Sequence, residues 1–145
     1  MAKFSTGLRN KMLDTNSMKS IMAAGFLKIY SGTAPADADA ALTGTLITTI
    51  SIASSGVGIN FAAAAAAGVL AKLGSETWSG INGASATATH FRHVAVGDTG
   101  ALSTTEARIQ GTCALAGGDL NLTNLSLVAS NTQVIDFYNV ALPTL

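Results

Sequence analysis

Hydrophobic and polar residues alternate in short runs over most of the chain, and glycine, serine, asparagine and aspartate separate these runs. Such period-two alternation between turn-forming residues is typical of strands that bury one face. The expected strands include residues 26–31, 45–52, 86–96, 109–115 and 133–142. About seven or eight short strands at this spacing predict a mainly β fold, either a sandwich or a barrel.

The hydrophobic pattern predicts a clear secondary structure for one of two segments and an ambiguous one for the other. Within 45–52, Leu46, Ile50 and Ile52 share one phase, so we expect them on one face of the sheet with the threonines on the other. Residues 59–73 contain a run of six alanines that is too short for a stable helix. For this segment we expect a short strand on each side of a tight alanine turn.

The later strands carry specific expectations as well. Residues 86–96 are predicted to form one long strand, and 133–142 is apolar on both faces, which indicates a central or covered strand. Residues 117–119 (Gly-Gly-Asp) predict a hairpin turn. The leucines before and after Thr123-Asn124 differ in phase, so a bulge or break is expected there.

The first 24 residues show a helical period instead. Leu8 and Met12 are four residues apart, as are Met18 and Met22. Ser5 or Thr6 is suited to cap the start, the polar residues 14–17 predict a break, and a second short helix should end at Gly25. We therefore expect an N-terminal helical arm over 1–25 and a β-domain over 26–145.

Charge is distributed unevenly between these two parts. The net charge is zero, but residues 1–28 hold five basic residues against one acid (+4), and residues 29–145 hold three against seven (−4). The low charge argues against nucleic-acid binding, which needs a strong basic field. The basic arm could contact an acidic neighbour or could be a solvated helix.

Other features of the composition bear on oligomeric state and on the cellular compartment. The hydrophobic content of 48% is largely alanine, and the few aromatic side chains favour association with partners to bury more surface. A single cysteine excludes an intrachain disulfide and fits synthesis in a reducing cytoplasm. We expect no signal peptide and no membrane span.

Three patterns were considered as reactive sites. His90 and His93 would point to opposite faces of a strand, so a polar strand at a sheet edge or subunit contact is preferred over a metal site. Asp98-Thr99-Gly100 matches the aspartic protease signature, which a single copy could complete only as a homodimer; Gly97 departs from that pattern, and a plain turn is favoured. Cys113, in an apolar strand, is expected to be buried and unreactive.

Three further residues are expected to have structural roles only. Asp37 and Asp39 could touch calcium, but no further ligand pattern follows, so a solvated loop is expected. Trp78 could lie in the core or at an interface, and the core is slightly favoured. The sequence therefore predicts no catalytic residue, no metal and no cofactor.

The order of elements resembles that of small structural proteins in the virions of tailed bacteriophages, of the capsid decoration (cement) type. The resemblance covers nearly the whole chain and is carried by short motifs: the helical segment from Ser5 to Met22, Ile29-Tyr30-Ser31-Gly32, Ala34-Pro35-Ala36-Asp37-Ala38-Asp39, Thr43-Gly44-Thr45-Leu46, residues 85–96 with Phe91-Arg92 at their centre, Gln110-Gly111-Thr112, Gly118-Asp119-Leu120-Asn121-Leu122 and residues 135–143.

This resemblance implies a jelly-roll-like β-sandwich on the capsid surface of a virion. It implies an oligomer, a homodimer or homotrimer, that bridges subunits of the major capsid protein and stabilises the head shell. The alternative is a tail or baseplate protein with a structural or receptor-binding role. Neither function involves catalysis, a cofactor, nucleic acid or a membrane.

The arm is the predicted partner-binding segment. Methionine adapts to irregular apolar surfaces, and basic side chains favour an acidic partner. The residues expected to contact the partner are Lys3, Phe4, Leu8, Arg9, Lys11, Met12, Met18, Lys19 and Met22. If the arm is separable, removal of residues 1–24 should leave a folded β-domain that no longer binds the particle.

Overall fold

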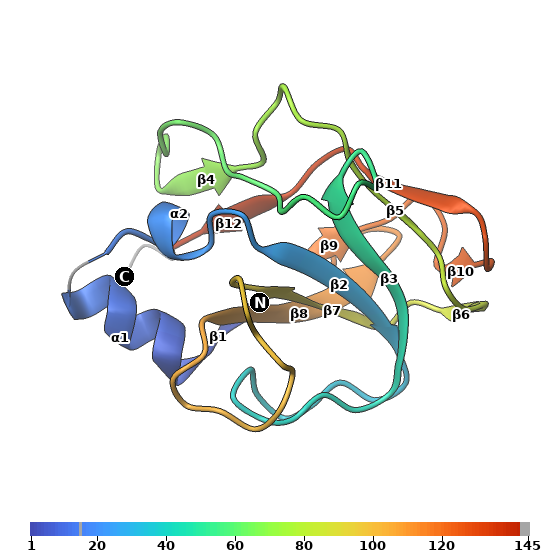
Figure 1. The fold of residues 1–145 in the computed structure, drawn as a ribbon, viewed down its shortest axis with the longest axis horizontal. Coiled ribbons are helices and arrows are strands. Elements are labelled where there is room, and N and C mark those ends of the chain that lie inside the picture. Colours follow the sequence, from blue (N-terminus) through green and yellow to red (C-terminus); the bar gives the residue numbers. More distant parts are fainter. Residues whose placement is uncertain (15, 143–145) are drawn as a thin grey trace.

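The computed structural model describes residues 1–14 and 16–142, and it is mainly β, with 38% strand and 9% helix (Figure 1). Two helices near the N-terminus, α1 (Thr6–Asp14) and α2 (Met18–Ile21), lie beside the sheets. The strands are β1 (Lys3–Phe4), β2 (Phe26–Ser31), β3 (Thr45–Ile52), β4 (Val69–Ala71), β5 (Trp78–Ile81), β6 (Ala86–Thr87), β7 (His90–Val94), β8 (Arg108–Ala114), β9 (Leu120–Asn121), β10 (Ser126–Leu127), β11 (Thr132–Ile135) and β12 (Asn139–Ala141).

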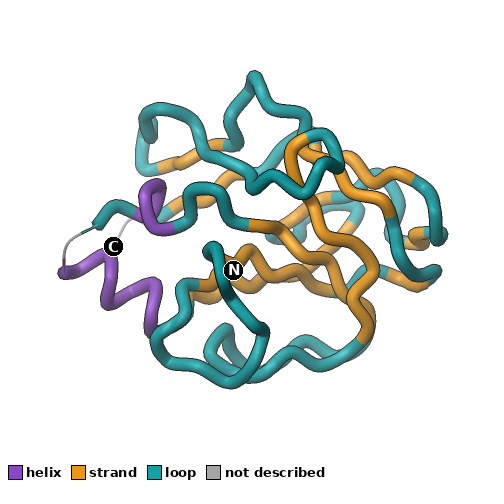
Figure 2. The backbone as a smooth tube through the Cα atoms, viewed as in Figure 1, coloured by secondary structure: helices purple, strands orange, loops and turns teal. Residues whose placement is uncertain are grey.

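One large sheet organises the molecule. Its strand order is β1-β8-β7-β2-β3-β5-β11 with antiparallel neighbours, and β9 adds to β8 in parallel. Two small ladders, β10-β6 and β12-β4, complete the strands, and long loops connect them (Figure 2). The predicted mainly β fold is therefore confirmed, and strands 26–31 and 45–52 have the predicted bounds.

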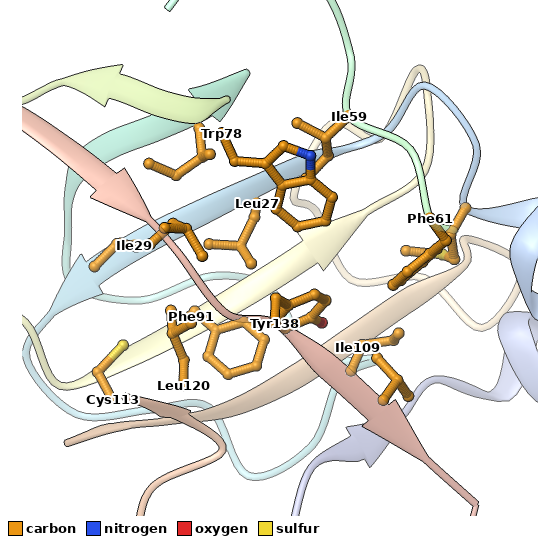
Figure 3. Packing of buried hydrophobic residues seen from close by; sticks show 14 of the residues in the cluster. Leu27, Ile29, Ile59, Phe61, Trp78, Phe91, Ile109, Cys113, Leu120 and Tyr138 are labelled. Carbon is orange, nitrogen blue, oxygen red and sulfur yellow. The ribbon is translucent and has the colours of Figure 1, made fainter. Parts of the chain in front are cut away.

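The core lies on one face of the large sheet, where β12 crosses it (Figure 3). Leu27 and Ile29 of β2, with Phe91 of β7, pack there against Trp78 and Tyr138. The rings of Trp78 and Tyr138 have centroids 5.8 Å apart, and Phe91 meets Tyr138 edge-on at 5.8 Å. Each of these large side chains contributes roughly 1.5–3 kcal/mol by leaving water. The assignment of Trp78 to the core is confirmed.

The N-terminal helices belong to this same core. Leu8, Met18 and Met22 are buried within the single hydrophobic cluster. Ser5 caps α1, since its Oγ accepts a hydrogen bond from the Leu8 amide at 3.1 Å, and Ser17 caps α2. The expectation of a separable arm is corrected, because its apolar stripe is already covered by this chain.

The face assignment within β3 was wrong for Leu46 and Ile47. Ile47 is the extra residue of a bulge, because Ile29 pairs with Thr48 and Tyr30 with Leu46. The bulge exchanges the faces of the residues before it. Ile47 is 1% exposed and Leu46 is 42% exposed, the reverse of the order that simple alternation predicts.

Two long predicted strands are each divided in the structure. Residues 86–96 form β6 in one of the small ladders and β7 in the large sheet. Residues 133–142 form β11 at the edge of the large sheet and β12 in the other ladder, and Phe137 between them is 83% exposed. The prediction of one central or covered strand there was wrong, because the chain turns from one sheet to the other.

The turn at 117–119 also differs from its prediction. β9 pairs with β8 in parallel, so the expected hairpin is wrong. The break at Thr123-Asn124 is confirmed, since it lies between β9 and β10. In segment 59–73 the alanines are mostly exposed, and the predicted strand after them is β4. The predicted strand before them was wrong, because Ile59 and Phe61 form only isolated bridges.

Candidate partner-binding surface

The outer face of the large sheet is a polar anchor cluster, formed by Arg92, Arg108, Gln110 and Asp98. Both arginines are fully buried. Arg92 donates to the Ala40 carbonyl at 2.9 Å and to Gln110 Oε1 at 2.5 Å. Arg92 on β7 lies directly opposite Gln110 on β8, and Arg108 is two residues before Gln110 on the same strand, so the sheet register places these three side by side.

This anchor cluster captures backbone carbonyls of two loops. Over 35–40, the Pro35 carbonyl accepts from Gln110 at 2.8 Å, and the carbonyls of residues 37–40 accept from the two guanidinium groups. Arg108 also donates to the Ala101 carbonyl at 2.8 Å. The loops thereby accept hydrogen bonds from most of the buried arginine donors, as burial of charge demands, and Arg92 Nε is left without a partner among the described residues.

Asp98 is the carboxylate of the cluster. Its Oδ2 lies 2.5 Å from Arg108 Nε and its Oδ1 3.0 Å from Arg108 Nη2, a bidentate pair with no exposed side-chain surface. Oδ1 also accepts from the Gly100 amide at 2.6 Å. The predicted turn is confirmed, and within it this carboxylate serves to hold Arg108. The ion pair of the cluster therefore belongs to Arg108.

The two histidines lie on opposite faces of β7, as the strand period predicts. His90 stacks on Tyr30 with ring centroids 5.4 Å apart, and His93 lies among Phe61, Trp78 and Tyr138 in the core. Burial lowers the pKa of His93 to about 3. β7 lies between β2 and β8, so the predicted edge or subunit contact was wrong.

The remaining polar candidates are also held in place. The Asp39 carboxylate accepts from the amide and the hydroxyl of Thr6, at 2.8 and 2.6 Å, so the expectation of a solvated loop was wrong for this residue. Cys113 is buried as expected, and burial raises the pKa of its thiol to about 12. Among the described residues, no three potential metal ligands gather at one place.

The predicted partner-binding residues fall into three groups. Leu8, Met18 and Met22 are buried in this chain's own core, which corrects their assignment to a partner surface. Lys3, Arg9 and Lys11 are exposed. Phe4, Met12 and Lys19 are half-buried at the margins of two grooves.

The first groove, named the edge slot here, has a volume of about 490 Å³. One wall is the N-terminal strand region, with Ala2 and Phe4, and the other is formed by residues 138–141. Phe91 and Ile109 form its floor, and Arg9 and Asp119 stand at its rim. Its lining is mostly apolar, in the size range of sites that bind a ligand or a short peptide.

The second groove, named the methionine groove here, has a volume of about 450 Å³ on the other side of β12. Met12 and Met18 line it from the helices, and Leu70 and Val140 line it from the β4-β12 ladder. Lys19 closes one margin and donates to the Ala63 carbonyl at 2.6 Å. Val140 belongs to both grooves, so together they form one surface around β12.

The sequence identified the helical side of this surface and missed the other side. Tyr138 and Val140 were assigned to a covered strand, and nothing in their local pattern indicated that β12 would border an opening. Neither described helix is long and apolar enough to cross a membrane. Comparisons of the chain with protein-family models, with curated proteins and with solved structures found no match.

Proposed function

We propose that this chain is a virion structural protein, a capsid decoration protein that acts as a homodimer or homotrimer and bridges subunits of the major capsid protein. One observation carries the proposal: two apolar grooves border β12, and each has a basic side chain at its margin, the exposed Arg9 of α1 at one and the half-buried Lys19 of α2 at the other. Apolar pockets with a charged margin suit a protein partner with acidic groups.

The finer fold proposed with this function is a jelly-roll-like sandwich. The β12-β4 ladder lies over the core face of the large sheet and supplies part of a second layer. The anchor cluster supports the proposal in a different way, because it fixes loops on the outer face and makes the body rigid. A rigid body loses little conformational entropy when it binds.

Charge reversal on α1 tests the proposal directly. Arg9→Glu with Lys11→Glu should reduce binding to stripped source particles by about tenfold or more, because an acidic surface would now be repelled. Lys28→Glu is the matched control, since Lys28 lies on the outer face of the sheet beside Arg92. If all three charge changes leave decoration intact, the proposed surface is not used.

Copy number separates this function from the tail or baseplate alternative. Quantitative mass spectrometry of purified virions should find on the order of hundreds of copies per particle for a protein that covers a symmetric shell. A few copies per particle would assign the chain to the tail instead.

A further inference from the structure

The two walls of the edge slot are both edges of β-sheets. β1 ends the large sheet and pairs only with β8 among the described strands, and β12 pairs only with β4. An unpaired edge presents backbone donors and acceptors and is a template for another strand. Here two such edges face one apolar cavity.

The register shows which backbone groups of β12 face the slot. The Lys72 amide donates to the Tyr138 carbonyl at 2.8 Å, and the Leu142 amide donates to the Gly68 carbonyl at 3.1 Å. Bonded and non-bonded pairs alternate along an antiparallel ladder. Asn139 and Ala141 are therefore in non-bonded pairs with β4, and their N–H and C=O groups point away from it.

The same reasoning applies to β1. The Ser5 amide donates to the Arg108 carbonyl at 3.0 Å, which makes Lys3 with Gln110 the next bonded pair. Phe4, opposite Ile109, is then non-bonded with β8, so its backbone groups point to the free edge. Phe4, Asn139 and Ala141 all line the slot.

We propose that the edge slot binds an extended segment of a partner protein, with alternating apolar side chains and acidic flanks, which adds as a strand between β1 and β12. Its inward side chains would rest on Phe91, Ile109 and Val140. The identity of the partner rests on the proposed function, under which it is the major capsid protein. The mode of binding is inferred from the two strand edges alone.

The occupant must have both of its own edges free, because it pairs on both sides. Every described strand of this chain is already paired on at least one side, so a strand of a second copy cannot fill the slot without leaving its sheet. This requirement favours an arm or loop of a different protein. Strand addition of this kind is an established mode of peptide recognition.

Charge and an unpaired polar atom add to the argument. The guanidinium group of Arg9, at the rim, donates to the Thr6 hydroxyl at 3.0 Å through one of its nitrogen atoms, so an acidic flank would find further donors there. The buried Tyr138 hydroxyl has no hydrogen-bond partner within residues 1–14 and 16–142. An inserted polar side chain or carbonyl could pair with it.

A tethered strand tests the slot without the natural partner. The full chain would be extended after Leu145 by a flexible Gly/Ser linker and the probe Glu-Val-Thr-Ile-Thr-Val-Glu; tethering raises the effective concentration to about the millimolar range. The control tether replaces both threonines of the probe with proline, which removes donors. Amide hydrogen exchange by NMR is the measurement.

The expected signature follows the register. Amides of Phe4, Asn139 and Ala141 should exchange at least about tenfold more slowly with the probe than with the control tether. Amides of Lys3 and Val140, which already pair within the chain, should not change. If the amides of Phe4, Asn139 and Ala141 exchange at the same rate with both tethers, the proposal that the edge slot binds a strand is wrong.

A variant pair connects the slot to the particle. Ala141→Pro removes the amide at the free edge, and Ala141→Val keeps it at the same position. Loss of decoration in the proline variant alone supports strand addition by the shell. If the tethered probe protects the edge amides while the proline variant still decorates particles, the slot stands and the capsid protein is not its partner.

Discussion

The two faces of the large sheet differ in whether their polar groups have partners within the chain. On the outer face, Arg92, Arg108 and Gln110 capture loop carbonyls, and Asp98 neutralises one of the charges. On the core face, the edge slot leaves the backbone of two strands without a partner strand. The closed side stabilises one conformation of this chain, whereas the open side is complete only when another segment joins it.

The largest expected effect concerns the N-terminal residues. Deletion of residues 1–24 removes β1 and three core side chains, Leu8, Met18 and Met22. At about 2–5 kcal/mol each, these losses approach or exceed a typical total stability of about 5–15 kcal/mol. The truncated chain should be unfolded by circular dichroism and NMR.

A matched pair on α1 controls for this deletion. Leu8 is 0% exposed and Leu13 is 84% exposed on the same helix. Leu8→Ala should lower the free energy of unfolding by about 2–5 kcal/mol, and Leu13→Ala by less than about 0.5 kcal/mol. A folded truncated chain, or equal effects of the two substitutions, would restore the view of a separable arm.

Next in size is the anchor cluster. Arg108→Met leaves the Asp98 carboxylate buried without its cation, and the free energy of unfolding should fall by about 3–5 kcal/mol in urea titrations. Adding Asp98→Asn should recover part of the loss, because it removes the uncompensated charge. Arg9→Met, at an exposed arginine, should change stability by about 0.5 kcal/mol or less. If the two arginine substitutions cost the same, the closed face does not depend on this ion pair.

The pH dependence of stability tests the core beneath the slot. The pKa of His93 is about 3 in the folded chain, against an ordinary 6.5. Between these values the unfolded chain binds a proton that the folded chain does not, so stability is complete above pH 6.5 and is lost as pH falls, by up to about 1.4 kcal/mol per unit. Urea midpoints between pH 4.5 and 6.5 should follow this slope.

His93→Gln should flatten that slope, while His90 remains as a smaller contribution in the same direction, because burial lowers its pKa too. For Glu76 and Asp119, burial raises the pKa, but several hydrogen bonds and a neighbouring positive charge together outweigh it and lower the pKa, so both carboxyl groups act mainly below this window. An unchanged slope in His93→Gln would show that another group carries the dependence.

The smallest expected effect is on the free edge of β12. Ala141→Pro should cost no more than about 1 kcal/mol, because the Ala141 amide points away from β4. Val140→Pro, one residue earlier, removes an amide that pairs with β4 and should cost about 3 kcal/mol or more. Equal losses in urea titrations would mean that the register derived for β12 is incorrect.

The sequence predicted elements whose pattern is local and missed features set by distant contacts. Strands 26–31 and 45–52 and the cap at Ser5 depend on neighbouring residues, and these predictions were confirmed. The bulge at Ile47 and the burial of Leu8 depend on which segments meet in space, so alternation and helical period could not reveal them.

The candidate site shows the same limit. A basic, methionine-containing segment indicated one margin of the grooves, through Arg9 and Met12. The opposite wall arises because the chain leaves the large sheet after Ile135 and forms β12 elsewhere. Apolar residues on both faces of 133–142 fit a covered strand as well as a strand that borders an opening.

The pairing of β1 with β8 joins two strands that are synthesised at very different times. The Arg108 amide donates to Ser5 Oγ at 2.9 Å across a separation of 103 residues. At about 5–20 residues per second, the first strand leaves the ribosome on the order of ten seconds before its neighbour exists. Throughout that interval Phe4 is on a nascent chain without the strand that it later pairs with, so β1 can join the sheet only when translation is nearly finished.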